Sequence, residues 1–140
     1  MGVIAMSLLI KKILQKIKDF EERTKDSGWI NLELLTGWQE HSSGAQNPPQ
    51  YEKKNGIVFL HGCAMTSTGT SSSNRNIAQL PEGFRPSGTV NNLYYTVRIS
   101  SGAESIIGHV QITKTGIIMA PSNLKANDWL ALEGISFPVE

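Results

Sequence analysis

The stretch LYYTVRISSGAESIIGHVQIT, residues 93–113, alternates apolar and polar side chains on both sides of a short Ser- and Gly-containing turn. Strict alternation of this kind predicts two β-strands, because successive side chains of a strand point to opposite faces of a sheet. One face carries the odd positions of 93–99 and the even positions of 106–112, which are mostly apolar. The other face of the predicted hairpin aligns Tyr94, Thr96, Arg98, His109 and Gln111.

Around this hairpin, residues 29–140 are rich in Gly, Ser, Thr and Asn, and their short apolar runs are separated by turn residues. This pattern is typical of an antiparallel β-sandwich or barrel, so the predicted fold is mainly β. The polar stretches 39–50 and 66–76 are expected to be loops, and Asn55-Gly56 and Lys114-Thr115-Gly116 are expected to be hairpin turns. The expected strands are Trp29–Leu35, Tyr51–Lys54, Ile57–Ala64, Asn76–Leu80, Thr89–Ser100, Glu104–Thr113, Ile117–Ala120 and Trp129–Phe137.

The N-terminal region has a different period. Apolar residues recur there at intervals of three and four, and no Gly or Pro interrupts them after Gly2. This heptad spacing predicts an α-helix from Val3 to Arg23, about 31 Å long at 1.5 Å per residue. The a and d positions of the heptads are Val3, Met6, Ile10, Ile13, Ile17 and Phe20.

These six residues are predicted to form the core of a parallel trimeric coiled coil. Isoleucine at both a and d of the central heptad favours three strands over two. Leu9 at g and Leu14 at e widen the apolar stripe, and Lys16 at g can meet Glu21 at e of a neighbouring helix. The alternative is a single amphipathic helix that packs against its own domain. The helical pattern fades at Thr24, so the expected domains are a coiled-coil helix, residues 1–27, and a β-sandwich head, residues 28–140.

Composition limits the functions that the chain can have. A formal net charge of +1 gives no global field for nucleic acid, and one cysteine with three histidines offers no zinc-type ligand set. We therefore expect neither nucleic-acid binding nor a metal or other cofactor. The apolar run 1–10 precedes its lysines, unlike a signal peptide, and is too short to span a bilayer, so membrane insertion is not expected. Translation could start at Met1 or at Met6.

No catalytic motif stands out. The sequence has no G-x-S-x-G elbow, no P-loop and no G-x-G-x-x-G, and Cys63 lies in an apolar run that is typical of a core strand. We therefore expect a protein that is not an enzyme.

The candidate ligand-binding residues are Trp38, His41, Tyr94, Arg98 and His109. Tyr94, Arg98 and His109 share the polar face of the predicted hairpin, and together they could stack on a sugar ring and bind hydroxyl or phosphate oxygens. Trp38 and His41 open the first long polar loop, where an indole could serve as a stacking platform. The alternative for the hairpin face is a solvated surface or a subunit contact. The other tryptophans are expected at the base (Trp29) and in the core (Trp129).

Several short motifs, taken in the order in which they occur along the chain, resemble the head domain of baseplate or receptor-binding tail proteins from phages of Gram-positive bacteria, as in lactococcal phages. The most specific is the turn LPEGFRP, residues 80–86, in which Phe84 is expected to plug the end of the sandwich and Arg85 to bond exposed carbonyl groups. The others are WINL (29–32), LTGW (35–38), Tyr51 with Lys53 and GIV (56–58), and WLALEGISF (129–137).

The resemblance implies a homotrimer of β-sandwich heads that binds a host cell-wall saccharide and assembles with other tail or baseplate proteins. It also implies a protein made in the host cytoplasm, carried at the tail tip of the virion and active at the host cell surface. One alternative is a purely structural baseplate subunit that docks onto another tail protein. A glycan hydrolase is a third hypothesis.

Overall fold

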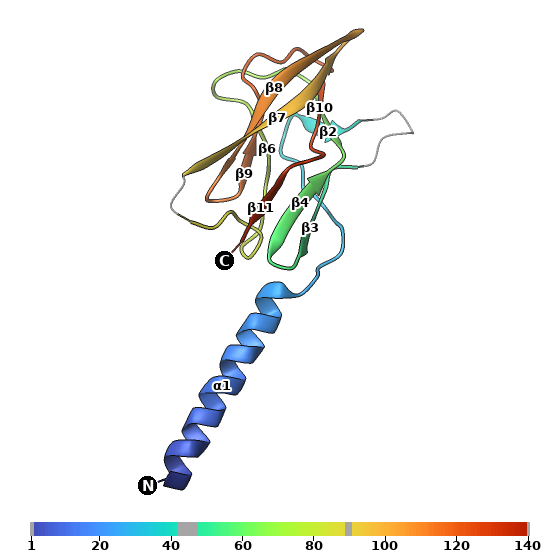
Figure 1. Cartoon of the computed structure of the whole chain (residues 1–140). Helices are drawn as coiled ribbons and strands as arrows, with labels where there is room; N and C mark the ends of the chain where they lie inside the picture. Colours follow the sequence, from blue (N-terminus) through green and yellow to red (C-terminus); the bar gives the residue numbers. More distant parts are fainter. Residues whose placement is uncertain (1, 42–47, 89–90, 140) are drawn as a thin grey trace.

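A computed structural model of the chain describes residues 2–41, 48–88 and 91–139. It consists of one long helix followed by a β region (Figure 1). Helix α1 (Gly2–Thr24) projects away from the strands. Its six a and d side chains are between 48% and 86% exposed, and every described side chain from Gly2 to Glu22 is exposed. The alternative that the helix packs against its own domain is therefore wrong.

Strands β1 to β11 form two antiparallel sheets. The order in the four-stranded sheet is β1-β3-β4-β11, and the order in the seven-stranded sheet is β2-β5-β10-β7-β8-β9-β6. The strands are β1 (Ile30–Asn31), β2 (Trp38–Glu40), β3 (Gln50–Lys54), β4 (Ile57–His61), β5 (Cys63–Thr66), β6 (Asn76–Gln79), β7 (Asn92–Ser101), β8 (Glu104–Thr113), β9 (Ile117–Met119), β10 (Trp129–Ala131) and β11 (Ser136–Pro138).

The two sheets curve into a nearly closed barrel, because two segments of chain pass from one sheet to the other. β4 continues into β5 through Gly62, and β10 leads to β11 through a turn that contains Gly134. At the opposite edges, Leu34 forms a β-bridge with Ala78, and the N–H of Leu35 donates to the carbonyl of Ile77 over 2.8 Å. The expected mainly β fold is confirmed.

Two predicted strands are each divided in the structure. Ile57–Ala64 is broken at Gly62, whose φ is 88°, and Trp129–Phe137 is broken at Gly134, whose φ is 86°. Closing a barrel requires the strands to bend, and glycine reaches positive φ without a steric penalty. The apolar runs continue across these bends because both sheets face one core.

The segment between the helix and β3 also differs from expectation. The predicted strand Trp29–Leu35 shortens to β1, and Trp38–Glu40 forms β2, which pairs with β5. The loop expected from Gln39 therefore begins later, and its residues 42–47 lie outside the described part of the chain. β7 starts at Asn92 rather than Thr89, and residues 89–90 also lie outside it.

The predicted hairpin 93–113 is confirmed, and its two strands pair in one continuous register. Tyr94 pairs with Gln111, Thr96 with His109, and Arg98 with Ile107. Val97, Ile99, Val110 and Ile112 are buried, which places the core on the face predicted to be apolar. The larger side chains that complete the core are Val58, Leu60, Ile77, Leu80, Ile118, Leu130, Leu132, Ile135 and Phe137.

The turn at residues 80–86 has the predicted structural role. Phe84 packs against the core with its ring centroid 5.0 Å from that of Tyr51, and the Arg85 Nε donates to the Leu80 carbonyl over 3.0 Å. This turn therefore closes one end of the barrel.

A few hydrogen bonds join the segment that follows the helix to the strands. The N–H of Ser27 donates to the Lys53 carbonyl and the N–H of Lys53 donates to the Ser27 hydroxyl, each over 2.9 Å, and the N–H of Asn55 donates to the Asp26 carboxylate over 3.3 Å. The helix thus connects to the β3–β4 hairpin.

Two glycines allow a matched test of the backbone. Gly69 and Gly134 both have positive φ, 80° and 86°, but a Cβ on Gly69 would stand 2.7 Å from the Leu124 carbonyl oxygen, whereas a Cβ on Gly134 meets open space. We expect Gly134→Ala to lower the free energy of unfolding by about 1 kcal/mol and Gly69→Ala by about 3 kcal/mol. Urea denaturation checks this, and equal losses would contradict the close packing at Gly69.

Candidate functional site

The outer face of the β7–β8 hairpin gathers three of the predicted ligand residues. Tyr94, Arg98 and His109 all point away from the core, and the Tyr94 side chain is 64% exposed. A second arginine lies near this face, since the Arg75 Nη2 donates to the Gln111 side-chain oxygen over 3.4 Å. The buried Nε of Arg75 has no hydrogen-bond partner in the described part of the chain.

Arg98 is held by two contacts. Its Nε donates to the Ser105 hydroxyl on β8 over 2.9 Å, and its guanidinium carbon lies 5.4 Å from the centroid of the Trp129 ring. The first contact fixes the direction of the side chain, and the second is a cation–π interaction, which strengthens when it is shielded from water. The exposed guanidinium keeps further N–H groups for a ligand.

Trp129 also contacts His41. The two ring centroids are 4.7 Å apart with the ring planes at 63°, an edge-on arrangement. Trp129 lies on β10, where it pairs with Met65 of β5 and Ser100 of β7, so it has a strand on each side in the seven-stranded sheet. Its side chain is half-buried. We call His41, Arg98 and Trp129 the outer-face cluster. It combines an indole, an imidazole and a guanidinium within one small area.

The structure corrects two expectations about tryptophan. Trp38 is not displayed on a loop: it lies in β2, its indole is 8% exposed, and it belongs to the hydrophobic core. Trp129, expected in the core, is on the outer face instead. The alternation of Trp129 with Leu130 and Leu132, both buried, contains the signal that could have placed it.

Trp29, expected at the base, is 44% exposed and stacks on His61 with ring centroids 3.7 Å apart. The His61 Nε2 is also 2.7 Å from the Gln50 side-chain oxygen. His61 lies on β4 of the four-stranded sheet and Trp29 immediately precedes β1, so this pair is separate from the outer-face cluster.

Cys63 lies beside the outer-face cluster and is 2% exposed, as predicted for a core residue. Burial raises the pKa of its thiol, the charge of Glu133 raises the pKa further, and Arg98 lowers it. The net shift is upward, so the thiol is protonated at neutral pH. This is the opposite of what a nucleophilic cysteine requires.

Within residues 2–41, 48–88 and 91–139, no three His, Cys, Asp or Glu side chains gather closely enough to hold a metal ion. In the same ranges, no helix is both long and apolar enough to cross a membrane.

Comparison of the fold with solved structures gives two matches. The receptor-binding protein gp15 of Listeria phage PSA superposes with a TM-score of 0.64 at 19% sequence identity, over 97% of this chain and 78% of that protein. This protein has the fold of a phage receptor-binding protein. The head domain of lactococcal phage bIL170 superposes with a TM-score of 0.57 at 13% identity, over 80% of this chain and 97% of that domain.

The fold is thus shared at low sequence identity. In sequence comparisons, no protein family and no curated protein matches the chain. The Listeria match extends over 97% of the chain, which includes most of the 23-residue helix. The expected resemblance to the heads of phage receptor-binding proteins is confirmed by these structural neighbours.

The buried thiol gives a pH prediction. Because burial raises the pKa of Cys63, alkylation of the folded chain by iodoacetamide should have its midpoint above the ordinary value for cysteine, and it should be slow at pH 8. Alkylation in guanidinium chloride, where the midpoint returns to the ordinary value, is the control.

The same shift makes a prediction for stability. A pKa raised by folding stabilises the folded state below the ordinary pKa, and this contribution is lost as the pH rises through the folded value. Urea midpoints should therefore fall at alkaline pH, and fall less in Cys63→Ala. A native alkylation midpoint below that of the unfolded chain would contradict both expectations.

Proposed function

We propose that this protein is a tail-tip receptor-binding protein of a phage, and that it attaches the virion to a saccharide on the host cell surface without catalysis. The outer-face cluster on a receptor-binding fold is the observation that supports this best. The two structural neighbours are a phage receptor-binding protein and a phage receptor-binding head domain, which supports the same role for this chain.

The chemistry of the cluster suits a sugar. The apolar face of a pyranose ring can stack on an indole, and Arg98 and His41 flank Trp129 with groups that can bond hydroxyl or phosphate oxygens. Tyr94 and His109 extend the polar surface along the hairpin. The three members of the cluster include no carboxylate, so they provide no acid–base pair for glycoside hydrolysis.

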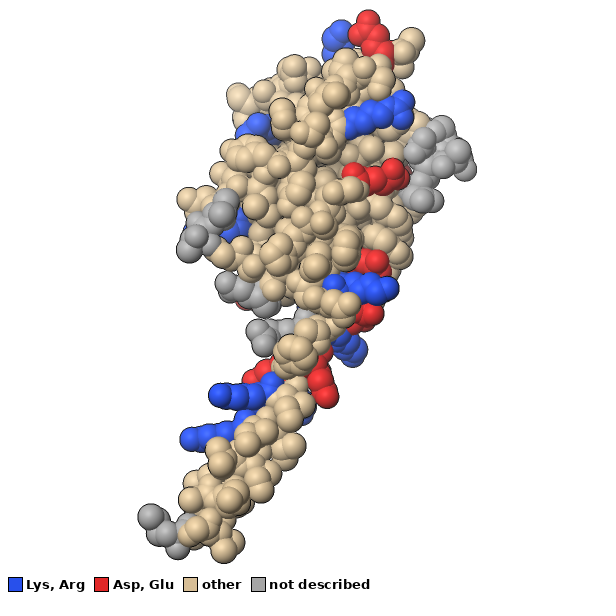
Figure 2. Space-filling model, viewed as in Figure 1, with Lys and Arg blue, Asp and Glu red and all other residues tan. Residues whose placement is uncertain are grey.

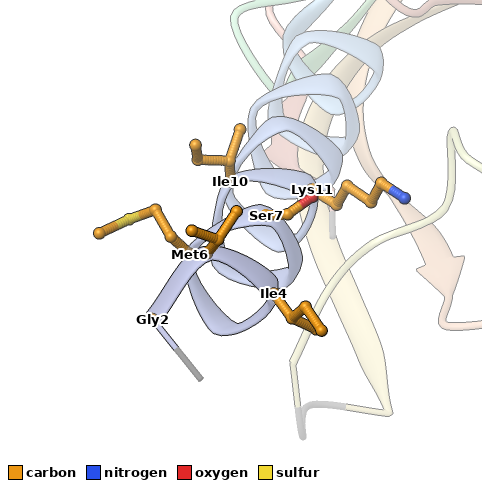
Figure 3. A pocket seen from close by; sticks show the side chains of 7 residues that line it. Gly2, Ile4, Met6, Ser7, Ile10 and Lys11 are labelled. Atoms are coloured by element: carbon orange, nitrogen blue, oxygen red, sulfur yellow. The ribbon is translucent and has the colours of Figure 1, made fainter.

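We further propose that residues 1–27 form the stem and residues 28–140 the head of a homotrimer. Figure 3 shows that Met6 and Ile10, at positions d and a, project to one side of α1, whereas Ile4 and Lys11, both at position b, project elsewhere. The hollow in this view is lined by residues of α1 alone, which fits an apolar surface that other copies would cover. In Figure 2 the end of the stem nearest the N-terminus shows no charged side chain on the visible side, and residues 2–10 contain no Lys, Arg, Asp or Glu.

Three heads on one stem would make weak sites effective. When one site is bound, the others meet the same surface at a high effective concentration, so the whole virion binds more tightly than one head. In this proposal the protein is located at the tail tip, together with other tail or baseplate proteins.

A second candidate is a structural baseplate subunit. Ile107 is 77% exposed on the same outer face, directly opposite Arg98, and an exposed apolar side chain there suits a contact with another tail protein. In this reading the face binds protein instead of saccharide.

The two candidates are separated by a binding assay. We expect Trp129→Ala and Arg98→Ala to reduce binding of the purified protein to host cells at least tenfold, because each removes part of the stacking and hydrogen-bonding surface. Lys54→Ala, an exposed cation on the four-stranded sheet, is the control and should bind normally. Binding that persists in both variants, or occurs only to another tail protein, would contradict saccharide attachment by this face.

The trimer has its own test. The full chain should have three times the monomer mass of 15.3 kDa in light scattering. Ile13→Lys places a charge at position d, in the core of the coiled coil, and should yield monomers. Gln15→Lys is the control: it places the same charge at position f, on the outside of a coiled coil, and should leave the trimer intact. A monomeric wild-type chain would contradict the proposal.

A further inference from the structure

A cleft lies at the closing edge of the barrel, on a different part of the head from the outer-face cluster. Two adjoining hollows of about 200 and 370 Å³ share Glu33, Gln79 and Pro81 in their walls. Asn31 and Tyr51 line the first hollow, and Leu35 and Arg85 line the second. We call this the seam cleft, since it occupies the edge where the segment after β1 meets β6 through the Leu34–Ala78 bridge.

The polar side chains of the seam cleft are held in place, and each keeps unused hydrogen-bonding atoms. The Asn31 Oδ1 accepts from Gln50 over 2.7 Å, which leaves its amide N–H groups. The Gln79 Nε2 donates to the Thr115 carbonyl over 3.2 Å, which leaves its side-chain oxygen. The Arg85 Nε bonds the Leu80 carbonyl, which leaves the terminal nitrogens of the guanidinium. Donors and acceptors that are already ordered lower the entropy cost of binding.

Glu33 is the carboxylate of this cleft. Within the described part of the chain it has no hydrogen bond or ion pair, and its charge is the second cause, after burial, that raises the pKa of Tyr51. Glu33 and Arg85 have opposite charges, so the cleft favours no net charge in a ligand. Ile30 and Leu35, 36% and 41% exposed, supply apolar walls.

We propose that the seam cleft is a second binding site, which takes one neutral, hydroxyl-rich ring of monosaccharide size. Hydroxyl groups can donate to the Glu33 carboxylate and the Gln79 oxygen while accepting from the Asn31 amide and the Arg85 guanidinium. The C–H groups of the ring would contact Ile30 and Leu35. The saccharide class rests on the proposed function, whereas the location of the site rests on the cleft alone.

The test is saturation-transfer NMR on the full chain with the methyl glycosides of glucose, galactose, rhamnose and N-acetylglucosamine. At least one should receive saturation from the wild-type protein. In the Arg98→Ala background, which disables the outer-face cluster, Glu33→Gln and Gln79→Ala should weaken its binding about tenfold, because each removes an acceptor for ring hydroxyls. Glu52→Gln is the matched control: it makes the same charge change on β3, one residue after Tyr51 and on the opposite face, and should leave binding unchanged.

Arg98→Ala separates the two sites. Sugar binding that survives Arg98→Ala but weakens in Glu33→Gln and Gln79→Ala supports the seam cleft, with circular dichroism showing that the variants fold. Sugar binding lost in Arg98→Ala and kept in both cleft variants overturns the seam cleft and leaves the proposed function intact. If no glycoside receives saturation, the cleft proposal fails, while host-cell binding still decides the proposed function.

Discussion

The ladder between β7 and β8 pairs ten residues of each strand without a bulge, and the arrangement of the head depends on it. Because the register is continuous, each alternate side chain is assigned either to the core or to the outer face along the whole hairpin. Ile99 and Val110 thereby enter the barrel, while Arg98 and His109 stay outside. A slip of one residue would exchange these two sets, and the core and the outer-face cluster would be lost together.

The helix, unlike the barrel, does not bury its apolar side chains within the chain. The barrel buries a core of its own, but α1 leaves the whole a and d stripe exposed in the single chain. An isolated helix of this length is marginal in water, since most helical stability in proteins comes from packing of the apolar face. The head buries its core within one chain, whereas in the proposed trimer the other copies would supply the partner for the exposed stripe of the stem.

The elements with long regular patterns can be predicted from the sequence. Short strands, and sites formed by residues far apart in the sequence, cannot. The hairpin 93–113 and the helix are long enough for their periods to be read directly. β2 and β10 have three residues each, so alternation within them is weak, and the roles of Trp38 and Trp129 were exchanged for that reason. The seam cleft joins Asn31 and Glu33 to Gln79 and Arg85, and only closure of the barrel brings these residues together.

The bridge between Leu34 and Ala78 has a consequence for crowded copies of the protein. Unpaired strand edges recruit strands from other molecules, which leads to edge-to-edge aggregation. The bridge covers part of the edge at β6, and the edge strand β2 is three residues long. Neighbouring heads can therefore be held at high local density without fusing into a continuous sheet.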